Sequence, residues 1–114
     1  MSSHLVEDAT LMTIDFEASI RAIAHPLRRE ILQWLKEPLR HFPDQEYGQN
    51  LGVCIGQIVL RCGLSQSTVS GHLALLKRAG LLDQRKSGTV CFVRRNEACI
   101  RSLGIMLERQ LQAE

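Results

Sequence analysis

The chain has 114 residues, a formal net charge of +2 at pH 7, 45% hydrophobic residues and 23% charged residues. This length suits one domain with its own core, to which assembly with a second copy would add stability. No apolar run approaches a membrane span, and the opening stretch MSSHLVEDATLM lacks the charged-then-apolar pattern of a secretory signal. We therefore expect a single domain over residues 1–114, located in the cytoplasm and without a membrane partner.

Enzyme motifs are missing from the sequence. It contains no Gly-rich phosphate loop, no paired carboxylates in an apolar setting, and no Cys-His or Ser-His arrangement with an orienting group. The four cysteines form no CxxC pair and are too sparse for a disulfide scaffold, which predicts reduced thiols. We therefore expect neither enzyme activity nor a cofactor.

Two helices are predicted in the N-terminal third. The first runs from about Ile14 to Ala24 and repeats apolar residues at helical spacing. The second begins in the stretch HPLRREILQWL, where Pro26 suits the first helical position and His25 stands in for an N-cap. The buried stripes of the two helices are expected to be Phe16, Ile20 and Ile23 in the first, and Leu27, Ile31, Trp34 and Leu35 in the second.

The stretch EPLRHFPDQEYGQNLG, residues 37–52, is predicted to be a loop. It holds two prolines and two glycines, and it is long for so small a domain. Two roles stay open for it: it either shapes an effector pocket or covers the domain. His41, Asp44 and Glu46 are assigned to this polar loop without a functional role.

A helix-turn-helix is predicted over about residues 56–79. A short helix over about 56–62 is joined by CGLS to a longer helix that begins at the N-cap Ser65 and stops at Gly80. The apolar stripe of the longer helix is Val69, Leu73 and Leu76. Its opposite face carries short or polar residues, namely Ser67, Ser70, Gly71, Ala74 and Arg78, with Gln66, Thr68 and His72 towards the edges. Short side chains let a helix enter a DNA major groove, whereas an ordinary solvated helix would carry Glu and Lys there.

A basic hairpin is predicted directly after this unit. The stretch LLDQRKSGTVCFVRR divides around Ser87 and Gly88 into two short strands, which gives a wing over about residues 81–95. Residues 61–95 hold seven basic residues against one acidic residue, while the rest of the chain is net negative. This distribution is typical of a surface that neutralises phosphates.

The last predicted helix, about residues 96–112, has an apolar side too wide for one neighbour to cover. That side comprises Cys99, Ile100, Leu103, Met106, Leu107 and Leu111. The predicted fold is therefore mainly α with a small β-hairpin, a winged helix-turn-helix of five helices plus the wing.

Three stretches, AIAHPLRREILQWL, LSQSTVSGHLALLKRAGLL and RKSGTVCFV, resemble those of the ArsR-type bacterial winged-helix repressors. The resemblance covers nearly the whole chain. It implies a homodimer built on the first and last helices, about residues 14–24 and 96–112. It also implies binding to an inverted repeat in double-stranded operator DNA and release by an inducer, which the sequence does not identify.

Candidate DNA-binding residues lie on the longer helix and in the hairpin. Gln66 is the candidate for paired hydrogen bonds to an adenine, and Arg85 and Lys86, expected at the hairpin tip, for phosphates or a narrow minor groove. Gly71 stands where the family often has a second histidine or another polar residue. The full candidate set is Ser65, Gln66, Ser67, Thr68, Ser70, Gly71, His72, Lys77, Arg85 and Lys86.

The inducer class depends on the cysteines. Metal sensors of the family carry Cys-x-Cys near the start of the third helix. Here GVCIGQI has Cys54 at the position of the first cysteine but Gly56 in place of the second, and the last helix has no histidine. No metal site is therefore expected, because soft metals need three or four ligands. Cys62 and Cys91 are expected to be buried, and Cys54 with Cys99 is the hypothetical redox pair, for which the alpha carbons must lie within about 7 Å. A metal-responsive repressor of the same fold and a winged-helix protein-interaction module remain the alternatives.

Overall fold

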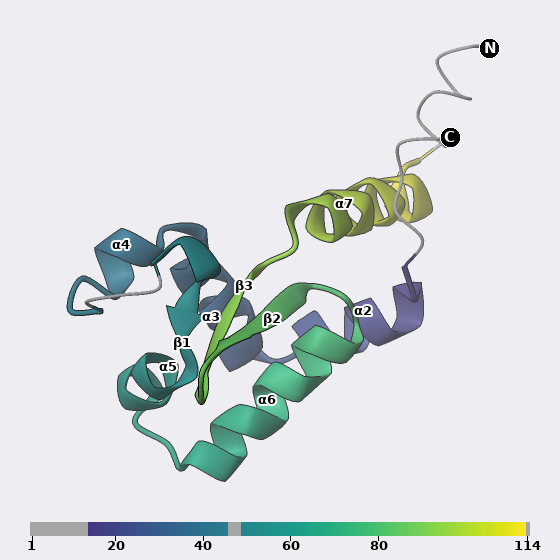
Figure 1. The fold of residues 1–114 in the computed structure, drawn as a ribbon. Coiled ribbons are helices and arrows are strands. Elements are labelled where there is room, and N and C mark those ends of the chain that lie inside the picture. Colours follow the sequence, from purple (N-terminus) through teal and green to yellow (C-terminus); the bar gives the residue numbers. More distant parts are fainter. Residues whose placement is uncertain (1–13, 46–48, 114) are drawn as a thin grey trace.

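The computed structural model describes residues 14–45 and 49–113, and the labels below follow Figure 1. Within these ranges no helix is both long enough and apolar enough to cross a membrane. The elements in chain order are α2 (Phe16–Ile23), α3 (Pro26–Lys36), α4 (Pro38–His41), the 3-10 turn η1 (Gln49–Leu51), β1 (Val53–Cys54), α5 (Ile55–Cys62), α6 (Gln66–Arg78), β2 (Leu82–Ser87), β3 (Val90–Arg95) and α7 (Glu97–Leu111).

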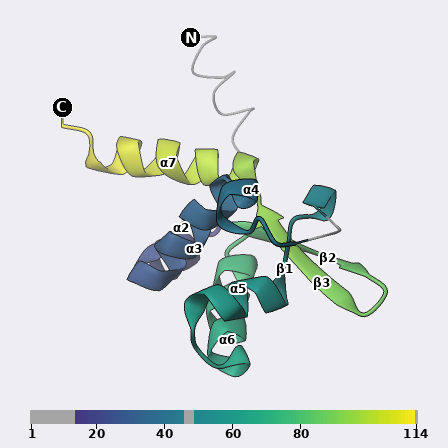
Figure 2. The ribbon, with the colours of Figure 1, turned by 90° about the vertical axis from the view of Figure 1, so that its left-hand side faces the viewer.

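The three strands form one antiparallel sheet in the order β1-β3-β2. The β2–β3 hairpin is paired from Leu82↔Arg95 to Ser87↔Val90, so its two-residue turn is 88–89, one residue later than the sequence predicts. On the other edge, β1 adds the pair Cys54↔Phe92. Figure 2 shows the hairpin projecting from the molecule beside α5 and α6. The predicted wing is confirmed, and a third strand ties its base to the start of α5.

The ends of α3 and α6 lie where the sequence places them. The Ser65 hydroxyl accepts a hydrogen bond from the Thr68 amide (3.2 Å), and Nδ1 of His25 accepts one from the Leu27 amide (3.1 Å). Each cap satisfies an amide that the first turn of a helix leaves unpaired. Gly80, with φ +84°, adopts the left-handed conformation that stops α6. The predicted caps and stop are confirmed.

The core lies between α6, α3, α5 and the sheet. The α6 stripe is almost fully enclosed, with exposed fractions of 0% for Val69, 5% for Leu73 and 0% for Leu76. Ile31 of α3 and Ile58 of α5 are likewise buried, so the two preceding helices supply the cover. This packing holds α6 rigid from behind and leaves its opposite face to solvent.

The segment predicted as a loop, 37–52, has structure of its own in its described part. It contains α4 and η1 and leads into β1, so the described residues hold six α-helices rather than the expected five; residues 46–48 lie outside the described ranges. Phe42 is buried and meets the Trp34 ring edge-on at a centroid distance of 6.3 Å. The Gln45 side chain donates to the Gly52 carbonyl (3.0 Å) and accepts from the Cys54 amide (2.8 Å). The described part of this segment covers the core.

The last helix is enclosed only at its beginning. Cys99, Ser102 and Leu103 are buried, whereas Leu111 is 80% exposed. Figure 2 shows α7 extending away from the body of the molecule, towards the C-terminus. The helix therefore carries apolar surface that residues 14–45 and 49–113 leave uncovered.

Candidate nucleic-acid interface

The predicted recognition face lies on the outside of α6. Five residues of this face are exposed, namely Gln66, Ser67, Thr68, Ser70 and Gly71, whereas His72 is half-buried. No described atom lies within 4 Å of the place where a Cβ of Gly71 would stand, so this part of the helix surface is open. Ser65 is exposed but acts as the helix cap, and its hydroxyl is also 2.9 Å from the Thr68 hydroxyl. The face is flat enough for the helix to approach the edges of base pairs.

One edge of α6 lies against the hairpin. Lys77 is exposed, and its Nζ donates to the Gln84 side chain on β2 (3.1 Å). Nearer the start of α6, a cavity of about 310 Å³ separates the helix from the hairpin turn and the start of α5. Its lining residues are Cys54, Ile55, Gly56, Gln66, Ser70, Thr89, Val90 and Cys91. The structure thus brings Gln66 and Ser70 next to the end of the wing.

Arg85 and Lys86 lie on β2 and not at the hairpin tip, where the sequence predicts them. Arg85 pairs with Phe92 and Lys86 with Cys91, while the turn itself is 88–89. Both cations are exposed. Because successive strand residues point to opposite faces, Lys86 shares the face of Cys91, which lines the cavity beside α6, and Arg85 takes the other face. The two cationic side chains therefore lie on opposite faces of the wing.

The other edge of α6 meets the start of α3 through His72. Arg28 donates from Nη1 to Nδ1 of His72 (2.9 Å), and the His25 ring lies 4.7 Å from the His72 ring, tilted by 57°. Burial lowers the pKa of His72, and unfavourable electrostatic interactions of its protonated ring with His25 and Arg28 lower it further. Sequence reasoning missed Arg28, because a contact between residues 28 and 72 leaves no local pattern in either helix.

The structure does not bring Cys54 and Cys99 together. Cys54 lies beside Phe92 in the sheet, while Cys99 follows the end of β3 and lies under Gly80, where a Cβ would be 3.7 Å from its sulfur. The stretch of β3 from Phe92 to Arg95 alone spans about 10 Å, which exceeds the separation that a disulfide tolerates. All four cysteines are free thiols.

The burial of the cysteines also differs from expectation. Cys62 and Cys91, expected in the core, are half-buried, whereas Cys99, half of the hypothetical redox pair, is 5% exposed. Burial raises the pKa of the Cys99 thiol, and Asp83 raises it further. Burial, with a contribution from Glu30, raises the pKa of Cys62 as well. A raised pKa keeps a thiol protonated and unreactive, so Cys99 is a packing residue.

The part of the chain that the structure describes contains no cluster of metal-ligating side chains. Across residues 14–45 and 49–113, no group of three or more His, Cys, Asp or Glu side chains could hold an ion. Cys54, at the N-cap position of α5, forms no capping hydrogen bond through its sulfur.

A helix-turn-helix followed directly by a basic antiparallel hairpin defines a winged-helix DNA-binding domain. The family model for bacterial regulatory proteins of the arsR family matches residues 53–84, which span β1, the helix-turn-helix and the start of β2.

Relatives of the whole chain agree with this assignment. Over 93 residues the chain is 39% identical to the uncharacterised HTH-type transcriptional regulator YbzH of Bacillus subtilis (strain 168), a match that covers 80% of this chain and 93% of that protein. The chain belongs to the ArsR family of bacterial transcriptional regulators.

Solved structures give the same fold. HlyU from Vibrio cholerae N16961 is 26% identical with a TM-score of 0.54, and the match covers 84% of this chain and 90% of that chain. NolR from Sinorhizobium fredii is 25% identical with a TM-score of 0.56, and covers 86% of this chain and 85% of that one. The winged-helix architecture predicted from the sequence is confirmed.

Proposed function

We propose that this regulator is a homodimeric repressor that acts in the cytoplasm, binds an inverted repeat in an operator and leaves it when an inducer binds. The observation that carries the proposal is the exposed, short-chained polar face of α6, held rigid by a fully buried stripe and flanked by a basic hairpin. Repression is the simpler mode, because a protein that blocks a promoter needs no additional contact surface.

Base recognition is assigned to the first half of α6. Gln66 is proposed to form the paired hydrogen bonds to an adenine, with Ser67 and Ser70 reaching neighbouring base edges. Gln66→Ala should relax the base preference at one position of the operator. Arg85→Ala on the wing should instead weaken binding to all sequences alike. It should also reduce the slope of log K against log salt concentration by about 1, the contribution of one phosphate contact.

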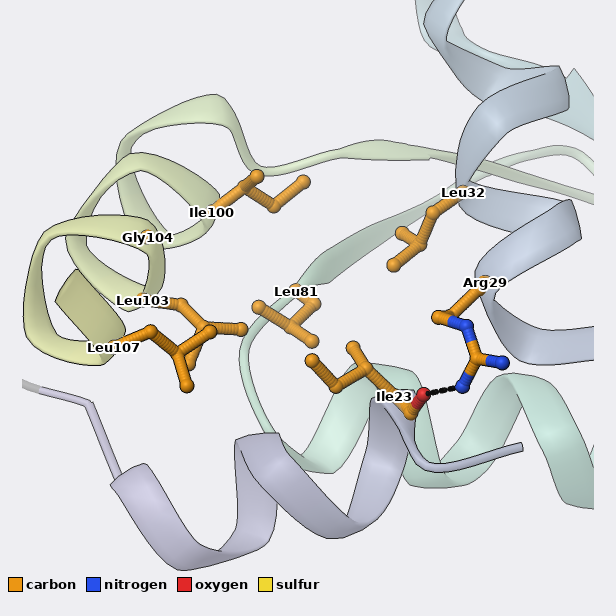
Figure 3. Close-up of a pocket in the computed structure, with 8 residues that line it drawn as sticks. All are labelled: Ile23, Arg29, Leu32, Leu81, Ile100, Leu103, Gly104 and Leu107. Carbon is orange, nitrogen blue, oxygen red and sulfur yellow. Dashed lines mark hydrogen bonds between the residues drawn. The ribbon is translucent and has the colours of Figure 1, made fainter. Parts of the chain in front are cut away.

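The homodimer is proposed to form along α2 and α7. Figure 3 shows an apolar groove of about 270 Å³ between α7 on one side and the end of α2 with α3 on the other. It has one charged side chain, Arg29, which donates to the Ile23 carbonyl. The lining residues are Ile23, Arg29, Leu32, Leu81, Ile100, Leu103, Gly104 and Leu107. A second copy is the occupant that fits, because α7 continues past the groove with apolar residues still exposed. A two-fold dimer would place two recognition helices about one turn of DNA apart.

For the inducer, thiol oxidation at Cys54 has more support than the Cys54–Cys99 disulfide. Cys54 is half-buried and lines the same cavity as Gln66 and Ser70, so a bulkier sulfur there would disturb the DNA-contacting surface. Peroxide treatment should release wild-type protein from DNA and leave Cys54→Ser bound. Equal release of both proteins would assign the oxidation to another thiol, and release of neither protein would favour a small-molecule inducer.

The experiment that tests the proposal is a bind-and-sequence selection. The reduced protein is incubated with fragmented genomic DNA of its source organism, and the retained fragments are sequenced. Enrichment of an inverted repeat supports the repressor, and a steep salt dependence of binding to that repeat supports phosphate contacts. No enrichment by a folded, dimeric protein would favour the alternative, a winged-helix module that contacts other proteins.

A further inference from the structure

We propose that His25 and His72 together clamp one backbone phosphate of DNA, each ring donating a hydrogen bond from Nε2 to a phosphate oxygen. The site lies where the start of α3 meets the middle of α6, on the edge of α6 away from the residues that face the wing. The inference rests on the proposed DNA-binding function and adds a contact from α3, a helix to which no DNA role has been assigned above.

The hydrogen bonds fix which nitrogen of each ring carries the proton. Arginine has only donors, so the contact from Arg28 Nη1 makes Nδ1 of His72 an acceptor. The Leu27 amide donates to Nδ1 of His25, which is therefore an acceptor too. A neutral imidazole whose Nδ1 accepts must carry its proton on Nε2. Both rings are consequently held as Nε2–H donors.

The two Nε2 donors are free to bind a ligand. Neither ring forms a hydrogen bond through Nε2 with any of the residues that the structure describes. His25 is exposed and His72 is half-buried, and their ring centroids are 4.7 Å apart. Nδ1 of His25 is engaged by the Leu27 amide and Nδ1 of His72 by the Arg28 guanidinium, so the Nε2 edge is the one that each ring has left for a ligand. Two adjacent donors match a phosphodiester, which offers two non-bridging oxygens.

Arg28 gives the pair its charge and its rigidity. Its guanidinium is held on three sides, because Nε donates to the Ala22 carbonyl (2.6 Å) and Nη2 to the Arg21 carbonyl (3.3 Å) in addition to the His72 contact. A ring that accepts a hydrogen bond from a cation becomes a stronger donor at its other nitrogen. Arg28 is therefore a positioning residue that orients and polarises His72, while its charge favours an anion nearby.

The position of the clamp agrees with the rest of the interface. Gln66, Ser70 and Lys77 lie on the edge of α6 that faces the wing, and His72 lies on the edge that faces α3. A helix seated in the major groove is bordered by a phosphate backbone on each side. The wing is suited to one backbone, and the His25–His72 clamp to the other.

The test is a set of binding titrations with a fluorescein-labelled random-sequence duplex of about 20 base pairs, because a phosphate contact acts on any sequence. Two variants each remove one imidazole, and with it the Nε2–H group that would reach the phosphate, but keep the local role of the side chain. His25→Ser retains an N-cap, and His72→Asn retains an acceptor for Arg28. The matched control is His41→Asn, which alters a similar Arg–His contact between Arg61 and His41 (3.3 Å) outside the proposed interface.

Each clamp variant is expected to weaken binding about tenfold, since a hydrogen bond to a charged group is lost. The salt dependence should stay as in the wild type, because a neutral ring releases no counterion of its own. His41→Asn should bind as the wild type. Equal binding by wild type and both clamp variants would overturn the clamp alone. Failure of the wild-type protein to bind any duplex would overturn the proposed function and the clamp with it.

A second measurement separates the positioning role of Arg28 from a merely structural one. Long-range proton–nitrogen correlation spectra of the free protein at neutral pH should show both rings as the Nε2–H tautomer. In Arg28→Lys, one ammonium cannot replace all three hydrogen bonds, so the His72 ring should lose this preference. A dominant Nδ1–H tautomer in the wild type, or an unchanged His72 tautomer in Arg28→Lys, would overturn the assignment.

Discussion

Helices α6 and α7 carry similar apolar stripes but differ in how much of the stripe the described part of the chain covers. In α6 the three stripe residues are at most 5% exposed, and the polar face opposite is free. In α7 the stripe is buried at Leu103, half-buried at Leu107 and 80% exposed at Leu111. The stripe of α6 is therefore enclosed by the described residues, whereas α7 ends in apolar surface that they leave uncovered. In the proposed homodimer a second copy covers this surface.

The largest effect expected from this difference concerns the α6 stripe. Leu76→Ala should lower the free energy of unfolding by about 2–5 kcal/mol, because Leu76 is fully buried and its removal leaves a cavity. The matched control Leu60→Ala, at a site that is 75% exposed, should stay within about 0.5 kcal/mol. Urea unfolding followed by circular dichroism measures both, and a small loss for Leu76→Ala would contradict the enclosed core.

The α7 surface is tested by a change at Gly104, which lines the apolar groove. No described atom lies within 4 Å of the Cβ that a side chain would add there, so the monomer accepts a larger residue. Gly104→Glu should raise helix propensity by about 0.5–1 kcal/mol yet weaken the dimer at least about tenfold, by placing a charge in the interface. Sedimentation equilibrium measures the dimer, and Ala98→Glu on the same helix is the control. A dimer unchanged by Gly104→Glu would locate the interface elsewhere.

The start of α6 offers a comparison between two neighbouring serines. Ser65→Ala should lower the free energy of unfolding by about 1 kcal/mol, because the hydroxyl caps the Thr68 amide. Ser67→Ala should leave stability within about 0.5 kcal/mol and weaken operator binding instead, because Ser67 lies on the outward face. Thermal unfolding and anisotropy titrations together separate the two roles. Equal stability of the two variants would remove the capping role from Ser65.

The smallest expected effect is a pH dependence of stability from His72. Its pKa in the folded protein is lowered below the ordinary value of 6.5, by burial first and then by His25 and Arg28. As the pH falls through about 6.5, the unfolded chain takes up the proton before the folded protein does, so stability decreases with decreasing pH and is unaffected at higher pH. The difference between wild type and His72→Asn in urea titrations from about pH 7.5 to 5 isolates this contribution. The stability of the wild type relative to His72→Asn should decrease as the pH falls. An increase in this relative stability would mean that folding raises the pKa of His72.

Sequence reasoning succeeds here where the signal is local. The Ser65 cap, the Gly80 stop and the His25–Pro26 start of α3 depend on residues within four positions of one another, and all three are confirmed. The stripe of α6 is equally local, because helical periodicity alone assigns it to the core.

Features that depend on contacts between distant residues could not be predicted, because no local sequence pattern encodes them. Strand β1 has two residues, too few for a pattern, and exists because it pairs with β3 some forty positions later. The Arg28–His72 contact and the separation of Cys54 from Cys99 are likewise set by how the elements pack. The two prolines of residues 37–52 favour a loop, but only Pro38 lies in α4, and it occupies the first turn, where proline is tolerated.

The guanidinium of Arg61, on α5, lies 4.7 Å from the centre of the Trp34 ring on α3, and also donates to the His41 carbonyl (3.2 Å). Trp34 is the only tryptophan in the chain. Its intrinsic fluorescence therefore reports on the seating of α5 against α3 without any label. A change in that emission on adding DNA or peroxide would follow movement of the helix-turn-helix in real time, from inside the protein.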